Sequence, residues 1–493
     1  IFLWAIGSVL YNLLLHPLAH QYPGPLFAQA SVLYQIYHEA AGQMPHVLTN
    51  LHRQYGPVVR IAPNELSFDD SSAWRDIYGN EATKMRKFHC RGSHGGYSSL
   101  GKDPIFYGPG ANNTPSILVC SNTDHQRFRK LLNHAFTSRA VMSQQELIQT
   151  HLDKLIDGLK EKSHQEDSRV TDLTLWFDSF GLDTISDLTY GQAFGCLEAK
   201  GAATPETEMV ARSLKISACY RLVRRLPYLV QRFIGAILPR SVIRKRQERL
   251  KYSLGKIHER INRGVNRPDV FWFLDESSDK GHMSLDEIAS SMSILMAAGS
   301  ETTATTLAGC VFCMLHSPKT FEELRQEISL QFENETDITL ERLSLCPKLT
   351  AVINEALRVY PPTPCTLPRR VPPGGSIIAK RHVPPGTVVG VNHWVTHRSP
   401  RHFTKPTEFV PKRWLEDSPF PEDDKSAFKP FITGPRNCLG QRLADAELRL
   451  VLARLAWNFD LKLQAESEDW IVQKAFTLWS KPPLLVKVSP RKD

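Results

Sequence analysis

The sequence lacks the features that mark several protein classes. It has nine cysteines in 493 residues, an odd and widely scattered set, whereas a secreted disulfide-bonded domain is denser in cysteine and usually holds an even number. The net charge of +9 is small for this length and argues against a dedicated nucleic-acid binder. With 42% hydrophobic and 23% charged residues, the chain predicts a folded globular protein with free thiols in a reducing compartment.

Long hydrophobic runs are also absent, apart from a short one at the start of the chain. Residues 1–15 are mostly apolar, and as a helix they would reach roughly 22 Å, less than the ~30 Å of a bilayer core. Prolines and glycines in residues 17–25 would end that helix and form a hinge. We expect residues 1–16 to be a membrane anchor or part of one, with an interfacial or structural helix as the alternative.

The rest of the chain shows no repeat, no low-complexity run and no long linker. Helical periodicity dominates residues 120–360, and short β-like, proline-rich pieces lie at 56–70 and 361–400. Although the length alone would allow three domains, this pattern predicts that residues 26–493 form a single, mainly α domain with a small β-rich subdomain.

The most informative segment surrounds a single cysteine. Residues 431–440 read Phe-Ile-Thr-Gly-Pro-Arg-Asn-Cys-Leu-Gly, and a helical pattern follows. Gly434 and Gly440 allow tight turns or the close approach of a flat ligand. We expect Arg436 and the helix N-terminus to stabilise a thiolate at Cys438. The alternative is a buried structural cysteine in a loop.

Two further helices carry polar residues in unusual places. A capping box at Ser284 and Glu287 predicts a helix that ends near His316, with Glu301 and Thr302 in its middle. An acid beside hydroxyls that bond the preceding turn can relay protons, whereas a close-packed helix crossing is the alternative.

A second helix should begin near Pro347 and end before residues 361–362, which are both proline. Glu355 and Arg358 fall together outside its apolar stripe, as an exposed pair or as part of a buried network.

Three of these segments resemble motifs of the cytochrome P-450 family: F-x-x-G-x-R-x-C-x-G, (A/G)-G-x-(D/E)-T and E-x-x-R. The resemblance implies a P-450 fold with a long central helix over haem b, and it makes Cys438 the axial iron ligand. By the same resemblance, Glu301 and Thr302 deliver protons for dioxygen activation. Glu355 and Arg358 would form a structural triad with Arg413, although the local sequence Pro-Lys-Arg-Trp departs from the family's usual form at Lys412.

The resemblance also implies haem and substrate contacts. Arg129, Arg436 and Arg369 are the expected partners of the haem propionates, with Arg370 as an alternative to Arg369. His125 replaces the tryptophan of the family's W-x-x-x-R segment. The other expected cofactor contacts are Phe431 and Gly440, and the expected substrate contacts are Ile294, Leu295, Ala298, Thr366 and Leu478.

The implied activity is the insertion of one oxygen atom of O2 into a lipophilic small molecule, most like that of fungal members that make secondary metabolites such as terpenoids, polyketides or alkaloids. The electrons would come from NADPH through a separate NADPH–cytochrome P-450 reductase, or cytochrome b5, at the endoplasmic reticulum membrane, with the catalytic domain in the cytosol and no nucleic-acid partner. The expected docking face for an acidic reductase consists of Arg127, Arg129, Lys130, Lys429 and Arg442. The alternatives are a haem-thiolate isomerase that rearranges peroxides and a non-catalytic haem sensor.

Overall fold

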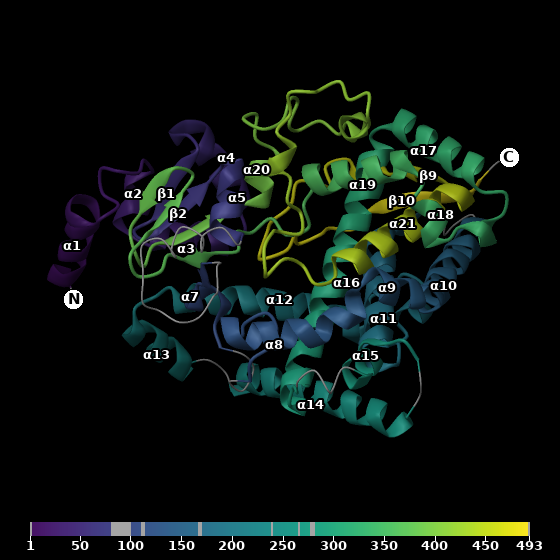
Figure 1. Ribbon diagram of the computed structural model, residues 1–493, viewed down its shortest axis with the longest axis horizontal. Coiled ribbons are helices and arrows are strands. Elements are labelled where there is room, and N and C mark those ends of the chain that lie inside the picture. Colours follow the sequence, from purple (N-terminus) through teal and green to yellow (C-terminus); the bar gives the residue numbers. More distant parts are fainter. Residues whose placement is uncertain are drawn as a thin grey trace.

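The computed structural model describes residues 2–79, 100–109, 114–165, 170–237, 240–264, 267–276 and 282–491. Cys90 lies outside these residues, and the other eight cysteines are free thiols. The two chain termini lie at opposite ends of the molecule (Figure 1). The fold is mainly α, as predicted from the helical periodicity.

The N-terminal third combines short helices with a sheet. Its helices are α1 (Phe2–Leu10), the π-helix Tyr11–Leu15, α2 (Leu26–Ala30), α3 (Leu33–Ala40), α4 (Met44–Tyr55), α5 (Ser71–Tyr78), α7 (Pro104–Tyr107), α8 (Asn122–Leu132) and α9 (Ser138–Ser143). The apolar start of the chain is helical as far as Leu15. Within the described part of the chain, no helix is both long enough and apolar enough to cross a membrane, so the anchor expected at residues 1–16 is not supported as a transmembrane helix.

The remaining helices build the larger part of the molecule. They are α10 (Gln145–His164), α11 (Leu173–Tyr190), α12 (Pro205–Arg224), α13 (Tyr228–Ile237), α14 (Arg240–Arg263), α15 (Val270–Glu276), α16 (Leu285–Leu315), α17 (Pro318–Gln331), α18 (Leu340–Leu343), α19 (Pro347–Val359), α20 (His393–His397) and α21 (Gln441–Asn458).

Three sheets complete the fold. The five-stranded sheet has the order β1 (Val58–Ala62), β2 (Glu65–Phe68), β8 (Val388–Val391), β5 (Arg369–Arg370), β3 (Gly101–Lys102), and only its β2–β8 pair is parallel. The second sheet joins β4 (Val170–Asp172), β10 (Leu485–Pro490) and β9 (Phe459–Leu463), and β6 (Ser376–Ile378) pairs with β7 (Arg381–Val383). The β-like pieces predicted at 56–70 and 361–400 are therefore confirmed, whereas β3, β4, β9 and β10 were not predicted.

Helix α16 runs through the middle of the molecule (Figure 1). The Ser284 hydroxyl accepts a hydrogen bond from the Glu287 N–H, and the Glu287 carboxylate accepts one from the Ser284 N–H, so the predicted capping box is present. The helix packs closely on α11, because a Cβ on Gly181 would lie only 2.9 Å from the carbonyl oxygen of Ser300. This packing covers one side of α16 and leaves Ala298, on another side, exposed.

Candidate functional site

The segment before α21 forms a tight loop that presents Cys438. The Cys438 N–H donates a 2.9 Å hydrogen bond to the carbonyl of Phe431, and the Asn437 N–H donates one of 3.1 Å to the carbonyl of Gly434. Gly434 has a φ of +81°, and a Cβ there would lie 1.9 Å from the carbonyl oxygen of Tyr78. Only glycine fits this position, because both the conformation and the space exclude a side chain.

The thiol of Cys438 lies just before the N-cap of α21, which is Gly440. Its side chain has an exposed surface but is closely surrounded by protein, and this burial raises its pKa, whereas the N–H of Gly440 and the charge of Arg129 lower it. Arg436, which was predicted to stabilise the thiolate, forms no hydrogen bond with the Cys438 thiol among the described residues. Its guanidinium instead donates to the carbonyl of Cys120 and to Asn122 Oδ1, each at 2.9 Å. Arg129, which donates to Asn437, is the cation that acts on the thiol.

Four cations surround His125 close to this loop. Burial, together with the charges of Arg436, Lys102, Arg129 and Arg369, lowers the pKa of His125 to about 3, so the imidazole is neutral. In the part of the chain that the structure describes, no carboxylate forms an ion pair with any of the four cations. Such a gathering of positive charge is costly unless an anionic group neutralises it.

Two of these cations also have a donor without a partner. Arg436 Nη1 and Arg369 Nε are buried and form no hydrogen bond among the described residues. Arg369 is 2% exposed and lies against the rings of Tyr78 and Tyr107. Arg370, the alternative from the sequence, is instead paired with Asp103 at 2.6 Å. The orphan donors fit a ligand that carries carboxylates, as the two haem propionates do.

Lys102 is a member of this cluster that sequence reasoning missed. It lies in the two-residue strand β3, and its ammonium donates to the carbonyl of Leu118. Burial lowers its pKa well below the usual value, and the charges of Arg369 and Arg436 lower it further. No motif marks this lysine among the 60 basic residues of the chain, so only the fold reveals it.

The middle of α16 exposes Ala298 and partly exposes Thr302, whereas Thr303 is buried. As predicted, the Thr302 hydroxyl donates to the carbonyl one turn earlier, that of Ala298, at 2.6 Å. The neighbouring Glu301 does not point the same way as Thr302. Its carboxylate forms a 2.6 Å ion pair with Lys481 on the C-terminal segment.

The expected substrate contacts lie in different surroundings. Ile294 is half-buried near Ala298, whereas Leu295 is only 9% exposed and belongs to the hydrophobic core. Thr366 lines a cavity of about 140 Å³, and Leu478 lines another of about 330 Å³ together with Glu301. The structure therefore does not bring these five residues to one surface, and Leu295 is a packing residue.

Glu355, Arg358 and Arg413 lie together in the core, each with a side-chain exposure of 0%. Arg358 contacts both carboxylate oxygens of Glu355, at 2.9 Å and 2.8 Å, and Arg413 contacts one of them at 3.3 Å. The indole of Trp414 donates to the same carboxylate at 2.9 Å, and Asp423 pairs with Arg413. Lys412 is exposed, so the departure from the usual motif does not enter the network.

The expected docking face is smaller than the sequence indicated. Arg127 is paired with Glu287 at 2.6 Å, and Arg129 is turned inward to Asn437. Lys130 and Arg442 are exposed, and Lys429 is half-buried. Three of the five expected basic residues therefore retain accessible charge.

Comparison with known proteins identifies this arrangement. The cytochrome P-450 family model matches residues 23–488. The chain belongs to the cytochrome P-450 family. It is 40% identical to cytochrome P-450 monooxygenase aclL of Aspergillus oryzae, over 99% of this chain and 96% of that protein. It is 38% identical to cytochrome P-450 monooxygenase astA of Talaromyces wortmannii, over 98% and 94%. It is 37% identical to averantin hydroxylase of Dothistroma septosporum, over 99% and 90%.

These relatives identify the chain as a P-450 monooxygenase, and they favour neither the isomerase nor the sensor. A P-450 uses haem iron held by a cysteine thiolate, and the residues present fit that group. Cys438 offers a thiol to open space, and orphan cationic donors lie close to its loop. Gly440 fits as well, since a Cβ there would meet no described protein atom within 4 Å.

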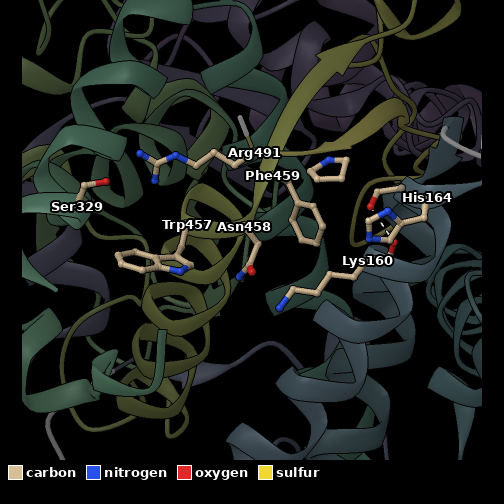
Figure 2. A pocket seen from close by; sticks show the side chains of 9 residues that line it. Lys160, His164, Ser329, Trp457, Asn458, Phe459 and Arg491 are labelled. Atoms are coloured by element: carbon tan, nitrogen blue, oxygen red, sulfur yellow. Dashed lines mark hydrogen bonds between the residues drawn. The ribbon is translucent and has the colours of Figure 1, made fainter. Parts of the chain in front are cut away.

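This P-450 has another cavity, of about 440 Å³, away from these residues. Lys160 and His164 of α10 line it on one side, and Trp457 and Asn458 at the end of α21 face them, with Arg491 nearby (Figure 2). Glu335 neutralises the adjacent basic groups, since it pairs with Lys160 at 3.1 Å and with Arg454 at 2.5 Å. None of the predicted site residues lines this cavity.

Proposed function

We propose that this P-450 binds haem b through Cys438 and inserts one oxygen atom of O2 into a lipophilic secondary metabolite. The observation that carries the proposal is the Cys438 loop beside four cations that lack carboxylate partners in the described chain. Together these provide a thiolate for the iron and donors for the propionates. Bound haem supplies the iron that activates dioxygen.

The chain's own residues supply the surroundings of that chemistry. Arg369 and Arg436 hold the propionates through their orphan donors, with Lys102 and Arg129 adding charge. Thr302 presents a hydroxyl whose proton is held by the Ala298 carbonyl and whose lone pairs remain free to accept a proton. Ala298 and Ile294 give the same stretch of α16 an apolar surface that excludes water.

A lipophilic substrate fits the cavity of about 140 Å³ at Thr366. Its wall includes Met44, Leu48 and Phe106, whereas Arg221 and Arg225 supply polar groups at the other side. This volume and this mixture of apolar wall and polar groups suit part of a mostly apolar molecule that carries some oxygen functions. The averantin hydroxylase among the relatives is named for a substrate of its own, and we propose a comparable class of compound for this chain.

The electrons come from NADPH through a separate NADPH–cytochrome P-450 reductase, with cytochrome b5 as a second donor. Lys130 and Arg442 are exposed, and their charges are available to an acidic partner domain. Pairing of Arg127 with Glu287 removes that arginine from the face. Substitution of Lys130 and Arg442 by Glu is expected to slow electron transfer most strongly at low ionic strength, because the attraction is screened by salt.

Association with the endoplasmic reticulum membrane, with the catalytic domain in the cytosol, is part of the same proposal. Large apolar side chains are exposed on the N-terminal helices and on α13, at one end of the molecule (Figure 1). They include Leu3 at 83%, Phe27 at 80% and Leu229 at 78% exposure. An apolar patch of this kind suits a lipid surface.

Flotation of the protein with phosphatidylcholine vesicles tests the membrane part. The double variant Leu229→Ser, Phe233→Ser on α13 should bind fewer vesicles than the native chain. Leu330→Ser is the matched control, because Leu330 is 89% exposed on α17, away from the apolar end. Equal flotation of native and double-variant protein would contradict a role for α13 at the membrane.

The carbon-monoxide spectrum of the reduced protein tests the function itself. The native protein should show the red-shifted Soret band that thiolate ligation produces, and Cys438→Ser should lose it. Cys219→Ser is the matched control for loss of a thiol, because Cys219 is exposed on α12 and should leave the band unchanged. A normal band in Cys438→Ser would overturn the assignment of the ligand.

A further inference from the structure

Two arginines of α12 line the cavity of about 140 Å³, and their charges have different partners. The guanidinium of Arg225 lies 2.9 Å from a carboxylate oxygen of Glu65 and 3.2 Å from one of Glu39. Arg221, one helical turn earlier, forms no ion pair in the described part of the chain. Burial raises the pKa of Glu39, and the charges of Arg225 and, less strongly, Arg221 oppose this effect. Arg221 therefore acts on the acids only through space, whereas Arg225 binds them directly.

The guanidinium of Arg221 is held by neutral groups and keeps unused donors. Its Nη2 donates to the hydroxyl of Thr477 at 2.6 Å and to the carbonyl of Phe476 at 3.4 Å. Its Nε is buried without a hydrogen-bond partner, and no described residue accepts a hydrogen bond from its Nη1. Its Cζ lies 4.7 Å from the centre of the Phe106 ring, which also lines the cavity. Charged donors without partners in such surroundings favour an anionic ligand.

Thr477, which holds Arg221, has an unusual backbone conformation. Its φ of +126° lies in the region that favours glycine, and a β-branched residue rarely adopts it. The turn around it is closed by a 3.0 Å hydrogen bond from the N–H of Phe476 to the carbonyl of Leu478. Strained residues of this kind are concentrated at binding and active sites. The strain therefore lies at the contact that orients the Arg221 guanidinium beside the cavity.

The same cavity borders the segment that carries a proposed haem contact. Pro368 lines the cavity and directly precedes Arg369, a proposed partner of the propionates. Two apolar side chains of α4, Met44 and Leu48, form another part of the wall. A ligand whose acidic end lies at Arg221 can therefore place apolar atoms against this wall and extend toward the proposed haem contacts.

We propose that Arg221 recognises the substrate of this P-450, and that this substrate is a lipophilic molecule with a carboxylate group. This inference rests on the proposed function and narrows its substrate class. The carboxylate accepts hydrogen bonds from the donors of Arg221 that the protein leaves free. Thr477 is the positioning residue, since it holds Nη2 and so fixes the plane of the guanidinium. Arg225 does not compete for the carboxylate, because Glu39 and Glu65 already bind it.

Binding of two probes of equal chain length to the ferric holoenzyme tests this assignment. Equilibrium dialysis with radiolabelled decanoate and decan-1-ol measures both dissociation constants, and the native protein should bind the acid at least about tenfold more tightly. Arg221→Met should weaken decanoate binding by roughly 10- to 150-fold, as expected for a lost charged hydrogen bond, and leave decan-1-ol binding unchanged. Arg221→Lys should retain part of the preference, because it keeps the charge but not the planar fork. Arg212→Met is the matched control, since Arg212 lies on the same helix but is 71% exposed and paired with Glu208.

The ratio of the two dissociation constants separates recognition from folding, because a merely structural change would weaken the binding of both probes alike. Thr477→Val keeps a branched side chain but removes the hydroxyl, and it should lower the preference for decanoate about threefold. Equal affinity of the native protein for both probes, an unchanged preference in Arg221→Met, or an equal loss of both probes in that variant would overturn the carboxylate site. The carbon-monoxide spectrum separates the two proposals. A native protein without the thiolate band would refute the function, whereas a native band with equal affinities would refute only the substrate class.

Discussion

The hydroxyl of Thr303 donates a hydrogen bond of 2.9 Å to the carboxyl group of Glu447 and so joins α16 to α21 in the core. Thr303 follows Thr302 on one helix, and Glu447 lies on the helix that begins after Cys438. Glu447 is 2% exposed and has no ion-pair partner in the described part of the chain. Burial raises its pKa to about 8, so a neutral acid connects the two helices at neutral pH.

Because Glu447 is protonated in the fold, we expect the free energy of unfolding to fall as the pH rises. In the unfolded chain Glu447 ionises near its ordinary pKa of 4.5, whereas in the folded protein it stays protonated up to about 8. The folded state therefore binds the extra proton, and its stabilising effect is fully present below pH 4.5 and lost as the pH passes through 8. Glu447→Gln should flatten the fall in the free energy of unfolding over this window by on the order of a few kcal/mol. Urea unfolding of the holoenzyme at several pH values measures this slope.

The same experiment needs a control for the hydrogen bond. Thr303→Val removes the donor but leaves the acid, so it should retain the pH slope while lowering stability by about 1 kcal/mol. An unchanged slope in Glu447→Gln would show that Glu447 is already ionised in the fold.

Prediction from the sequence worked best where local chemistry decides the structure. The capping box at Ser284, the proline at the start of α19 and the glycine of the Cys438 loop each act within a few residues, and all three are present as predicted. It failed where partners come from distant segments. Lys481 turns Glu301 away from Thr302 across 180 residues of sequence. No local sequence pattern predicts the contact between Glu301 and Lys481.

The cluster of four cations around His125 also could not be predicted in full from the sequence. The motifs indicated Arg129, Arg369 and Arg436, but Lys102 joins them only because β3 pairs with β5. The choice between Arg369 and Arg370 also depended on a distant acid, Asp103, which pairs with Arg370. Neighbouring arginines of one strand are equivalent in sequence, and only the fold distinguishes them.

The hydroxyl of Thr302 gives the next prediction. Thr302→Ala should keep the carbon-monoxide spectrum but lower the fraction of NADPH electrons that reach product on the order of tenfold, with peroxide formed instead. Thr306→Ala is the matched control, because Thr306 forms the same bond to the preceding turn, at 2.8 Å to the Thr302 carbonyl, but is buried. Product and peroxide measured per NADPH give the comparison, and full coupling in Thr302→Ala would remove it from the relay.

The buried triad of Glu355, Arg358 and Arg413 predicts that substitutions inside and beside it differ greatly in their effect on stability. Glu355→Ala leaves the guanidinium groups of Arg358 and Arg413 without their shared carboxylate, at positions that are 0% exposed. Loss of one partner from a buried ion pair costs about 3–5 kcal/mol, so the variant should unfold early and lose haem. Lys412→Ala should change stability by less than about 0.5 kcal/mol, because the side chain is exposed. Thermal unfolding of both variants beside the native protein measures the contrast. A mild effect of Glu355→Ala would mean that Asp423 alone holds Arg413.

The final prediction concerns haem retention at the cationic cluster. Arg369→Met keeps the length and apolar contacts of the side chain against Tyr78 and Tyr107 but removes the orphan donor. If that donor binds a propionate, its loss removes a charged hydrogen bond of about 1.5–3 kcal/mol, which corresponds to roughly 10- to 150-fold faster haem release. Arg370→Met is the matched control: the Nε of Arg370 also lacks a partner, but its Nη2 is held by Asp103 and its side chain is 37% exposed, so haem release should stay near the native rate. Transfer of haem to excess apomyoglobin measures both rates. Equal release from the two variants would place the propionates elsewhere in the site.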